Sequence, residues 1–231
     1  MTPALIFDLD DTLYPERQFV RSGFHAVASE VARRFGVPPR AALATLFHAL
    51  RHRNRGRAFQ ELCREHDLPA TIVPELVETF RAHVPTLRLP ASSIAALSAA
   101  RARGWRLGVL TNGLPDVQAR KAAALGLDAR VDAVVYAHDS RTGFGKPARE
   151  PFQDVLERLG ATAADSVFVG DDPWCDIAGA RLAGLRTILL WRREDSGPLA
   201  PACEPDVFVR GIDEVVTAVE RLWRGETVHV V

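Results

Sequence analysis

The stretch Ala4-Leu5-Ile6-Phe7-Asp8-Leu9-Asp10-Asp11-Thr12-Leu13 decides the fold, because a short apolar run ends abruptly in carboxylates. The apolar run predicts a buried strand with the acids at its C-terminal end. Ligands of open α/β sheets bind at that end, where Asp8 and Asp10 can meet a metal ion and a substrate together. The alternative is a polar turn or helix cap, for which Asp and Thr are also favoured.

The chain as a whole has the composition of an ordinary globular protein. Its 231 residues are 47% apolar and 25% charged, which suits one large domain or a core with a small insertion. Lys plus Arg equals Asp plus Glu at 29 each, so no global field attracts nucleic acid or an anionic membrane. We expect neither as a partner.

Location and redox state follow from features that the sequence lacks. The chain enters its first strand without the pattern of a signal peptide, and no apolar run is long enough to span a bilayer. We therefore expect a cytoplasmic protein. Cys63, Cys175 and Cys203 are odd in number and widely spaced, so we expect reduced thiols rather than disulfides or a zinc site.

Residues 16–85 are predicted to be helical. Apolar residues recur at helical spacing, as at Val20, Phe24, Val27 and Val31, and breaks at Pro38-Pro39 and Leu68-Pro69 help to divide the block into four short helices. We interpret it as an all-helical domain inserted after the first strand.

Beyond Pro90, predicted strands alternate with amphipathic helices. This pattern predicts an α/β fold with a Rossmann-like parallel sheet and helices on both faces, formed by residues 1–15 and 86–231. The further strands are expected at residues 106–110, 133–136, 166–169, 186–191 and 206–209, and the helices near residues 116–124, 151–159, 175–183 and 212–223.

Two polar clusters follow predicted strands or precede a helix. Thr111-Asn112-Gly113 offers a hydroxyl, an amide and a flexible glycine suited to phosphate oxygens, although an Asn-Gly turn is the plainer interpretation. Lys146, before Pro147, offers one cation but no P-loop, and a solvated loop lysine is its alternative.

The most specific cluster is Gly170-Asp171-Asp172, with Asp176 four residues later, after a strongly apolar strand. Crowded carboxylates repel one another unless a hard cation is present, and Mg²⁺ accepts carboxylates, waters and substrate phosphate together. Asp176 is expected to cap the following helix or to pair with a lysine rather than to bind the metal directly. Trp174 and Cys175, within this cluster, are expected to be packing residues.

The four clusters, in this order, resemble the motifs of the haloacid dehalogenase-like superfamily, in its phosphatase branch with a helical cap between the first and second motifs. The resemblance spans essentially the whole chain, and Ala148 departs from it where many relatives carry Asp. It implies that Asp8 is the nucleophile that forms an aspartyl-phosphate and that Asp10 is the general acid and base. It also implies that Mg²⁺ is bound by Asp8, Asp171 and the Asp10 carbonyl. Thr12, Asp172 and Asp176 would lie in the outer shell of the metal. The phosphate group would be bound by Thr111, Asn112, Gly113 and Lys146, of which Lys146 is also implied to be catalytic.

The resemblance predicts a Mg²⁺-dependent phosphatase for a small phosphorylated metabolite, such as a sugar phosphate, a nucleotide monophosphate or phosphoglycolate. A phosphomutase or phosphotransferase of the same fold is the main alternative. A 2-haloacid dehalogenase does not need Asp10, and a non-catalytic phosphate-binding module is expected to lose Asp8, Asp10 or Lys146. We expect a monomer or homodimer. The basic run from Arg51 to Arg57 is interpreted as a solvated helix end.

Overall fold

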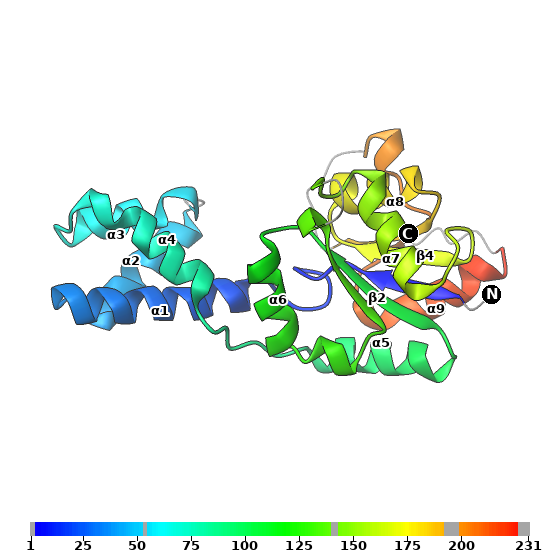
Figure 1. The fold of residues 1–231 in the computed structure, drawn as a ribbon, viewed down its shortest axis with the longest axis horizontal. Coiled ribbons are helices and arrows are strands. Elements are labelled where there is room, and N and C mark those ends of the chain that lie inside the picture. The colour runs from blue at the N-terminus through cyan, green and yellow to red at the C-terminus, as the bar shows by residue number, and fades with distance from the viewer. Residues whose placement is uncertain (1–2, 53–54, 140–142, 192–198, 226–231) are drawn as a thin grey trace. The chain divides into compact units, whose positions relative to one another are not determined.

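The computed structural model describes residues 3–52, 55–139, 143–191 and 199–225. It divides into two compact units, drawn in Figure 1. The sheet unit comprises Met1–Pro15 with Arg88–Val231, and the helical unit comprises Glu16–Leu87. None of the helices in the described ranges is both long and apolar enough to cross a lipid bilayer.

Six parallel strands form the sheet unit's described sheet, in the order β3-β2-β1-β4-β5-β6. The strands are β1 (Ala4–Phe7), β2 (Arg106–Thr111), β3 (Ala133–Tyr136), β4 (Ser166–Gly170), β5 (Arg186–Leu190) and β6 (Val207–Val209). All lie within or overlap the ranges that the apolar runs predict, so the predicted parallel α/β fold is confirmed. Their ends differ by no more than a residue, because a strand boundary depends on the partner strand as well as on its own sequence.

The order of the strands reverses at β1, which pairs with β2 on one side and with β4 on the other. Phe7 is level with Val109 of β2 and Val169 of β4. The loops that leave these three strands therefore begin at nearly the same height. In open α/β sheets this switch point is the place where a ligand binds.

Helices cover both faces of the sheet (Figure 1). α7 (Arg149–Leu159) packs on one face, where Phe152 and Val155 join Ile6 and Phe168 in a fully buried cluster. α5 (Ala91–Ala102) and α9 (Val215–Trp223) cover the opposite face and contact each other. Burying both faces explains why the strands read as continuous apolar runs rather than as alternating ones.

α5 is a helix that the sequence analysis does not name. Its alanine-rich sequence gives little contrast between its buried and exposed faces, so the usual helical periodicity is weak. Ser93 in its first turn donates a hydrogen bond to the carbonyl of Leu13 at 2.6 Å, and the contact is buried. The helix therefore anchors the polar loop that follows β1.

The helical unit contains the four expected α-helices and its own apolar core. They are α1 (Arg17–Phe35), α2 (Pro39–Arg51), α3 (Ala58–Glu65) and α4 (Val73–Ala82). α1 is longer than the short helices predicted, because no proline interrupts it and it continues through the buried Gly23 to Gly36, which ends it in the left-handed conformation at φ 72°. Val27, Leu46, Leu62 and Leu76 are completely buried in the core between these helices.

The boundary between the units falls after Leu87, whereas the sequence analysis places it after Pro85. The backbone N–H of Thr86 donates to the hydroxyl of Ser22 in α1 at 2.9 Å. This contact ties the connecting segment to the helical unit for two residues longer than the proline pattern indicates.

Candidate active site

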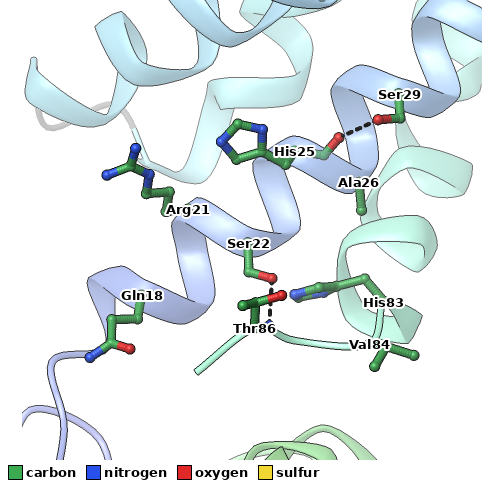
Figure 2. A pocket seen from close by; sticks show the side chains of 9 residues that line it. All are labelled: Gln18, Arg21, Ser22, His25, Ala26, Ser29, His83, Val84 and Thr86. Atoms are coloured by element: carbon green, nitrogen blue, oxygen red, sulfur yellow. Dashed lines mark hydrogen bonds between the residues drawn. The ribbon is translucent and has the colours of Figure 1, made fainter. Parts of the chain in front are cut away.

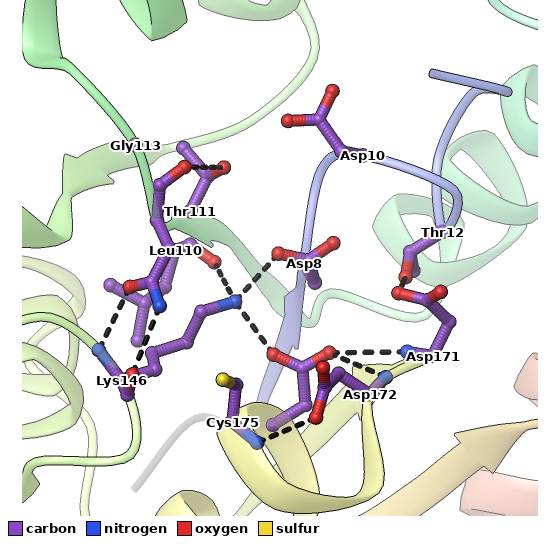
Figure 3. A network of polar contacts seen from close by, with 12 residues as sticks. Asp8, Asp10, Thr12, Leu110, Thr111, Gly113, Lys146, Asp171, Asp172 and Cys175 are labelled. Atoms are coloured by element: carbon purple, nitrogen blue, oxygen red, sulfur yellow. Dashed lines mark hydrogen bonds and ion pairs between the residues drawn. The ribbon is translucent and has the colours of Figure 1, made fainter. Parts of the chain in front are cut away.

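The four polar clusters meet at the C-terminal edge of the sheet, around the switch point (Figure 3). Asp8 follows β1, and its backbone N–H extends the sheet by donating to the carbonyl of Val169 at 2.8 Å. Asn112 and Gly113 follow β2, and Asp171 follows β4. Lys146 comes from the segment before α7 and reaches the same point.

The buried Lys146 ammonium is the contact that holds the site together. It donates to Oδ1 of Asp8 and to Oδ1 of Asp176, each at 2.6 Å, and to the carbonyl of Leu110 at 3.1 Å. The side chains of Lys146 and Asp176 are both 2% exposed. Removing Lys146 from this buried set is expected to cost roughly 3–5 kcal/mol, because the carboxylates of Asp8 and Asp176 would stay behind without a compensating charge.

Asp176 supports both the lysine and the loop after β4. Its Oδ2 accepts hydrogen bonds from the backbone N–H groups of Asp171 and Asp172, each at 3.1 Å. Gly170 makes this approach possible, since a Cβ at that position would lie 2.3 Å from Oδ2 of Asp176. Asp176 therefore takes the lysine-pairing role among the two roles expected for it.

Asp172, not Asp176, caps the turn that follows. Its Oδ1 accepts from the backbone N–H groups of Trp174 and Cys175, each at 2.8 Å, at the start of a π-helical turn over Pro173–Ala178. An Asp at this position satisfies two donors that the turn leaves without a partner. The side chain of Asp172 is thus used to shape the loop that presents Asp171.

The carboxylates of the site are crowded, and burial disfavours the ionised forms of two of them, Asp8 and Asp171. Burial raises the pKa of Asp8 well above its usual value, with Lys146 opposing this shift and Asp176 adding to it. Burial raises the pKa of Asp171 to about 6, and the charges of Asp176 and Asp11 contribute in the same direction. Lys146 experiences the reverse: burial lowers its pKa, but the Asp176 and Asp8 carboxylates together raise it above its usual value.

The donor set fits a hard divalent cation. Carboxylate oxygens of Asp8, Asp171 and Asp176 lie within 4.8 Å of one another. Asp176 already uses its oxygens on Lys146 and on two backbone N–H groups, which leaves Asp8 and Asp171 as the side chains suited to the metal. A cation between them would favour the ionised forms that burial opposes, and oxygen ligands are those that Mg²⁺ prefers. Thr12 donates to Oδ1 of Asp171 at 3.4 Å and orients that carboxylate.

Asn112 joins the second and third clusters. Its Oδ1 accepts from the backbone N–H of Lys146 at 2.8 Å, and its Nδ2 donates to the carbonyl of Lys146 at 2.9 Å. Both polar ends of the side chain are therefore used to hold the lysine. Gly113 is similarly engaged, because its N–H donates to Nδ1 of His138 at 3.2 Å, a histidine that sequence reasoning does not single out.

Asp10 lies apart from the contacts of Lys146, and its carboxylate points away from that of Asp8 (Figure 3). Lys121 donates to both of its oxygens at 2.8 Å, the Tyr14 hydroxyl donates to Oδ1 at 2.6 Å, and Gln118 donates to Oδ2 at 2.9 Å. Sequence reasoning misses these three partners, since none belongs to a recognisable motif.

One signal in the sequence does point to Lys121. The chain has 29 basic residues, and only two of them, Lys121 and Lys146, are lysines. Both are buried, and each contacts an aspartate of the first motif: Lys146 contacts Asp8, and Lys121 contacts Asp10. A chain that uses arginine almost everywhere else thus keeps a compact ammonium at these two positions.

Trp174 and Cys175 were both expected to pack inside the protein. The structure corrects this for Trp174, which is 60% exposed, because the π-helical turn directs it outward. Cys175 is half-buried, and burial raises the pKa of its thiol to about 11, which keeps it protonated and unreactive. The basic run from Arg51 to Arg57 includes residues 53 and 54, which lie outside the described residues.

A groove of about 690 Å³ lies on the helical unit, between α1 and the segment after α4 (Figure 2). Gln18, Arg21 and His25 line it from α1, and His83 lines it from the other side. Its described lining contains cationic and hydroxyl groups but no carboxylate. This chemistry suits an anionic or hydroxyl-rich ligand.

Comparisons with known proteins agree with the motifs. A model of the haloacid dehalogenase-like hydrolase family matches residues 2–184. Phosphoserine phosphatase of Thermus thermophilus is 32% identical over 194 residues, which cover 84% of this chain and 75% of that protein. Glyceraldehyde 3-phosphate phosphatase of Methanocaldococcus jannaschii is 31% identical over 195 residues, which cover 81% and 84%.

A solved structure with the same fold is named for a different activity. The 2-haloacid dehalogenase of Pseudomonas syringae pv. Tomato DC3000 superposes with a TM-score of 0.66 at 26% identity, over 96% of this chain and all of that one. The family match over most of the chain and the two phosphatase relatives confirm the resemblance inferred from the motifs. The protein therefore belongs to the haloacid dehalogenase-like hydrolase family, on the side of its phosphatases.

Proposed function

We propose that the protein is a Mg²⁺-dependent phosphatase that hydrolyses a small phosphomonoester through an aspartyl-phosphate on Asp8. The observation that carries the proposal is the buried Lys146, which contacts Asp8 at 2.6 Å beside the second metal-suited carboxylate, Asp171. Phosphoryl transfer needs an in-line nucleophile and positive charge around the phosphate oxygens, and these residues supply both.

In the first half-reaction, one Asp8 oxygen attacks phosphorus and the bond to the leaving-group oxygen breaks. Lys146 holds Oδ1 of Asp8, which fixes the carboxylate for attack, and offers its charge to the transferring group. Thr111, Asn112 and Gly113 are assigned to the phosphate-binding loop, with Asn112 acting through the backbone of Lys146. Asp10 gives a proton to the leaving group.

In the second half-reaction, Asp10 takes a proton from water, whose oxygen attacks the phosphorus of the intermediate. The bond to Asp8 breaks, its electron pair returns to the carboxylate, and inorganic phosphate leaves. Mg²⁺, when bound by Asp8, Asp171 and the Asp10 carbonyl, supplies a Lewis acid that stabilises charge on the phosphoryl oxygens. Thr12, Asp172 and Asp176 orient these groups.

The alternative functions differ in their use of Asp10. A dehalogenase of this fold does not need the second aspartate, whereas here Asp10 has three donor side chains around it. A phosphomutase keeps every motif, and product analysis with a sugar phosphate separates it from a phosphatase. The phosphatase relatives are named for phosphoserine and glyceraldehyde 3-phosphate, which supports a small phosphorylated metabolite as the substrate class. The cytoplasmic location and the oligomeric state stay predictions.

We assign substrate selection to the helical unit, acting as a cap, because the sheet unit already holds every group that phosphoryl transfer requires. The groove of the helical unit offers Arg21 and His25 as groups that suit an anionic or hydroxyl-rich ligand. The two units have separate apolar cores, which supports treating catalysis and selection as separable.

Asp8→Asn is expected to abolish phosphate release while the protein stays folded. An amide cannot attack phosphorus. The fold tolerates the change because Lys146 keeps its contact with Asp176 and because burial disfavours the charge of Asp8. Phosphate release and circular dichroism measure the two effects, with Asp116→Asn, an exposed position on α6 (Pro115–Ala124), as the control. Near-normal turnover in folded Asp8→Asn protein would contradict the mechanism.

Asp10→Asn is expected to slow turnover by about 10² to 10⁴, the usual size of general acid–base assistance. The rate of leaving-group release should fall more for an alkyl phosphate than for an activated aryl phosphate, because the aryl leaving group departs without a proton. Single-turnover release of both leaving groups measures this difference. Equal losses on the two substrates would show that Asp10 serves only the metal.

Asp171→Asn is expected to leave the thermal midpoint unchanged or to raise it when divalent cations are absent. The reason is that the change removes a charge disfavoured by burial and neighbouring acids. Mg²⁺ should raise the midpoint of the unchanged protein, by an amount equivalent to about 2.7 kcal/mol at one hundred times its Kd, but not that of Asp171→Asn. The Asp116→Asn control should keep the Mg²⁺ effect. Equal Mg²⁺ effects in all three proteins would remove Asp171 from the metal site.

Replacing residues 16–87 with a short linker is expected to leave a core that cleaves an aryl phosphate slowly but no longer discriminates among natural substrates. The measurement is the ratio of kcat/KM for the best natural phosphate ester to that for the aryl phosphate, in the full and shortened proteins. An unchanged ratio in a folded core would place selectivity in the sheet unit instead.

A further inference from the structure

We propose that His138 is a positioning residue for phosphoryl transfer, because it holds the peptide group between Asn112 and Gly113 in one orientation. Gln118 is its partner in this task. The inference rests on the proposed function, since that peptide group belongs to the loop assigned to phosphate. It gives a role to a histidine that lies outside the four motifs.

The register of the sheet places His138 beside this loop. Thr111 of β2 is level with Tyr136 of β3 in the parallel pair. Gly113 and His138 each come two residues later, so they leave the sheet at the same height. His138 lies in a short 3-10 turn directly after β3. The fold itself thus brings the imidazole next to the loop that follows β2.

Both ends of the peptide group are held by side chains. Its N–H, from Gly113, donates to Nδ1 of His138 at 3.2 Å. Its carbonyl, from Asn112, accepts from the amide nitrogen of Gln118. The two partners come from different elements, since Gln118 belongs to α6 and His138 follows β3. The peptide group therefore cannot turn over without losing both hydrogen bonds.

This restraint matters because a peptide group next to glycine can adopt more than one orientation. Gly113 has φ 125°, which residues with a side chain rarely adopt, and a Cβ there would lie 2.7 Å from Nε2 of Gln118. Glycine is thus required at this turn, but it does not select the orientation of the peptide group. Turning the group over would exchange the positions of a carbonyl and an N–H in a loop that must receive an anion.

The contact also determines which nitrogen of His138 carries the proton. A backbone N–H can only donate, so Nδ1 must offer a lone pair, and the proton of the neutral imidazole lies on Nε2. The Cε1–Nε2 edge of the ring lies against Gly145, where a Cβ would come 2.7 Å from Cε1 and 2.8 Å from Nε2. Since Gly145 precedes Lys146, His138 lies between the second motif and the lysine loop.

The same peptide group carries the side chain that holds Lys146. Asn112 accepts from the backbone N–H of Lys146 at 2.8 Å and donates to its carbonyl at 2.9 Å. Lys146 in turn contacts Asp8 at 2.6 Å. A change in the orientation of the peptide group would therefore disturb the phosphate loop and the lysine together. We expect the effect of His138 to fall on the transferring phosphoryl group, which all substrates share.

Two substitutions separate the hydrogen bond from the packing of the ring. Asparagine places Oδ1 where histidine has Nδ1, so His138→Asn keeps an acceptor for the Gly113 N–H and loses the outer part of the ring. His138→Phe keeps the ring and loses the acceptor. Because His138 is exposed, both variants are expected to fold, and their thermal midpoints check this. His48→Phe, at an exposed histidine of α2, is the matched control.

The kinetic experiment measures kcat/KM for phosphate esters with different leaving groups, and the inhibition constant of inorganic phosphate, with Mg²⁺ present. For His138→Phe we expect kcat/KM to fall, and the inhibition constant to rise, by about 2 to 12 times, the contribution of one hydrogen bond between neutral groups. The fall should be the same for every ester. His138→Asn and His48→Phe should both behave like the unchanged protein.

A spectroscopic measurement tests the contact without depending on activity or on the folding of a variant. NMR spectra of nitrogen-labelled protein should show the neutral imidazole of His138 with its proton on Nε2 and a bare Nδ1. The Gly113 amide resonance should move in His138→Phe and much less in His138→Asn. A proton on Nδ1 of the neutral imidazole would contradict the proposal.

Three kinetic results would overturn the inference. One is unchanged kcat/KM and phosphate inhibition in folded His138→Phe. Another is an equal loss in His138→Asn and His138→Phe, which would mean that the ring acts by packing alone. The third is a loss that differs among esters, which would place His138 at the leaving group. Failure of the proposed function looks different, because the unchanged protein would then show no turnover that depends on Asp8.

Discussion

The rest of the site depends on one buried ammonium that bridges two carboxylates. Lys146 joins Asp8 to Asp176 at 2.6 Å each, and Asp176 in turn holds the backbone after β4. Segments that lie more than a hundred residues apart in the chain are thereby fixed around a single charge. Burial raises the pKa of Asp8 and that of Asp171. The cluster also holds more carboxylates than ammonium groups, and the charge of Asp176 adds to both shifts. The same network that holds the proposed nucleophile thus forms a site whose charge a divalent cation would balance.

Much of this arrangement could be predicted from the sequence, because the sheet controls where its loops begin. Apolar runs located all six described strands, and the polar residues that follow β1, β2 and β4 had to meet once those strands were adjacent and parallel. The strand order was not predictable from the runs themselves, since pairing depends on contacts between distant segments. α5 was missed because its alanines give weak periodicity, and the second domain boundary shifted because of one hydrogen bond from Thr86 to Ser22.

The roles of individual side chains were less predictable than their positions. Asn112 was expected to bind phosphate, but in the structure both ends of its amide hold Lys146. Asp172 rather than Asp176 caps the turn. Asp172 stands just before the turn and accepts from the backbone N–H of Trp174, whereas Asp176 lies within the turn and accepts from the backbone N–H of Asp172. The composition also points to two positions. In a chain whose basic residues are nearly all arginines, the two lysines indicate sites with a particular requirement, although the composition does not identify their contacts.

Asp8 and Asp10 of the first motif illustrate how one chain places the same residue type in two different environments. Asp8 shares its lysine with Asp176 in a buried cluster, where negative charge is in excess and a bound metal ion would balance it. Asp10, two residues later, is more exposed, and its three donors satisfy it without a metal. A nucleophile must approach phosphorus beside a cation, whereas a base must face water with its orientation fixed. The chain turns at Asp11, which adopts a left-handed conformation. The conformation of this one loop residue helps to place the carboxylates of Asp8 and Asp10 in different environments.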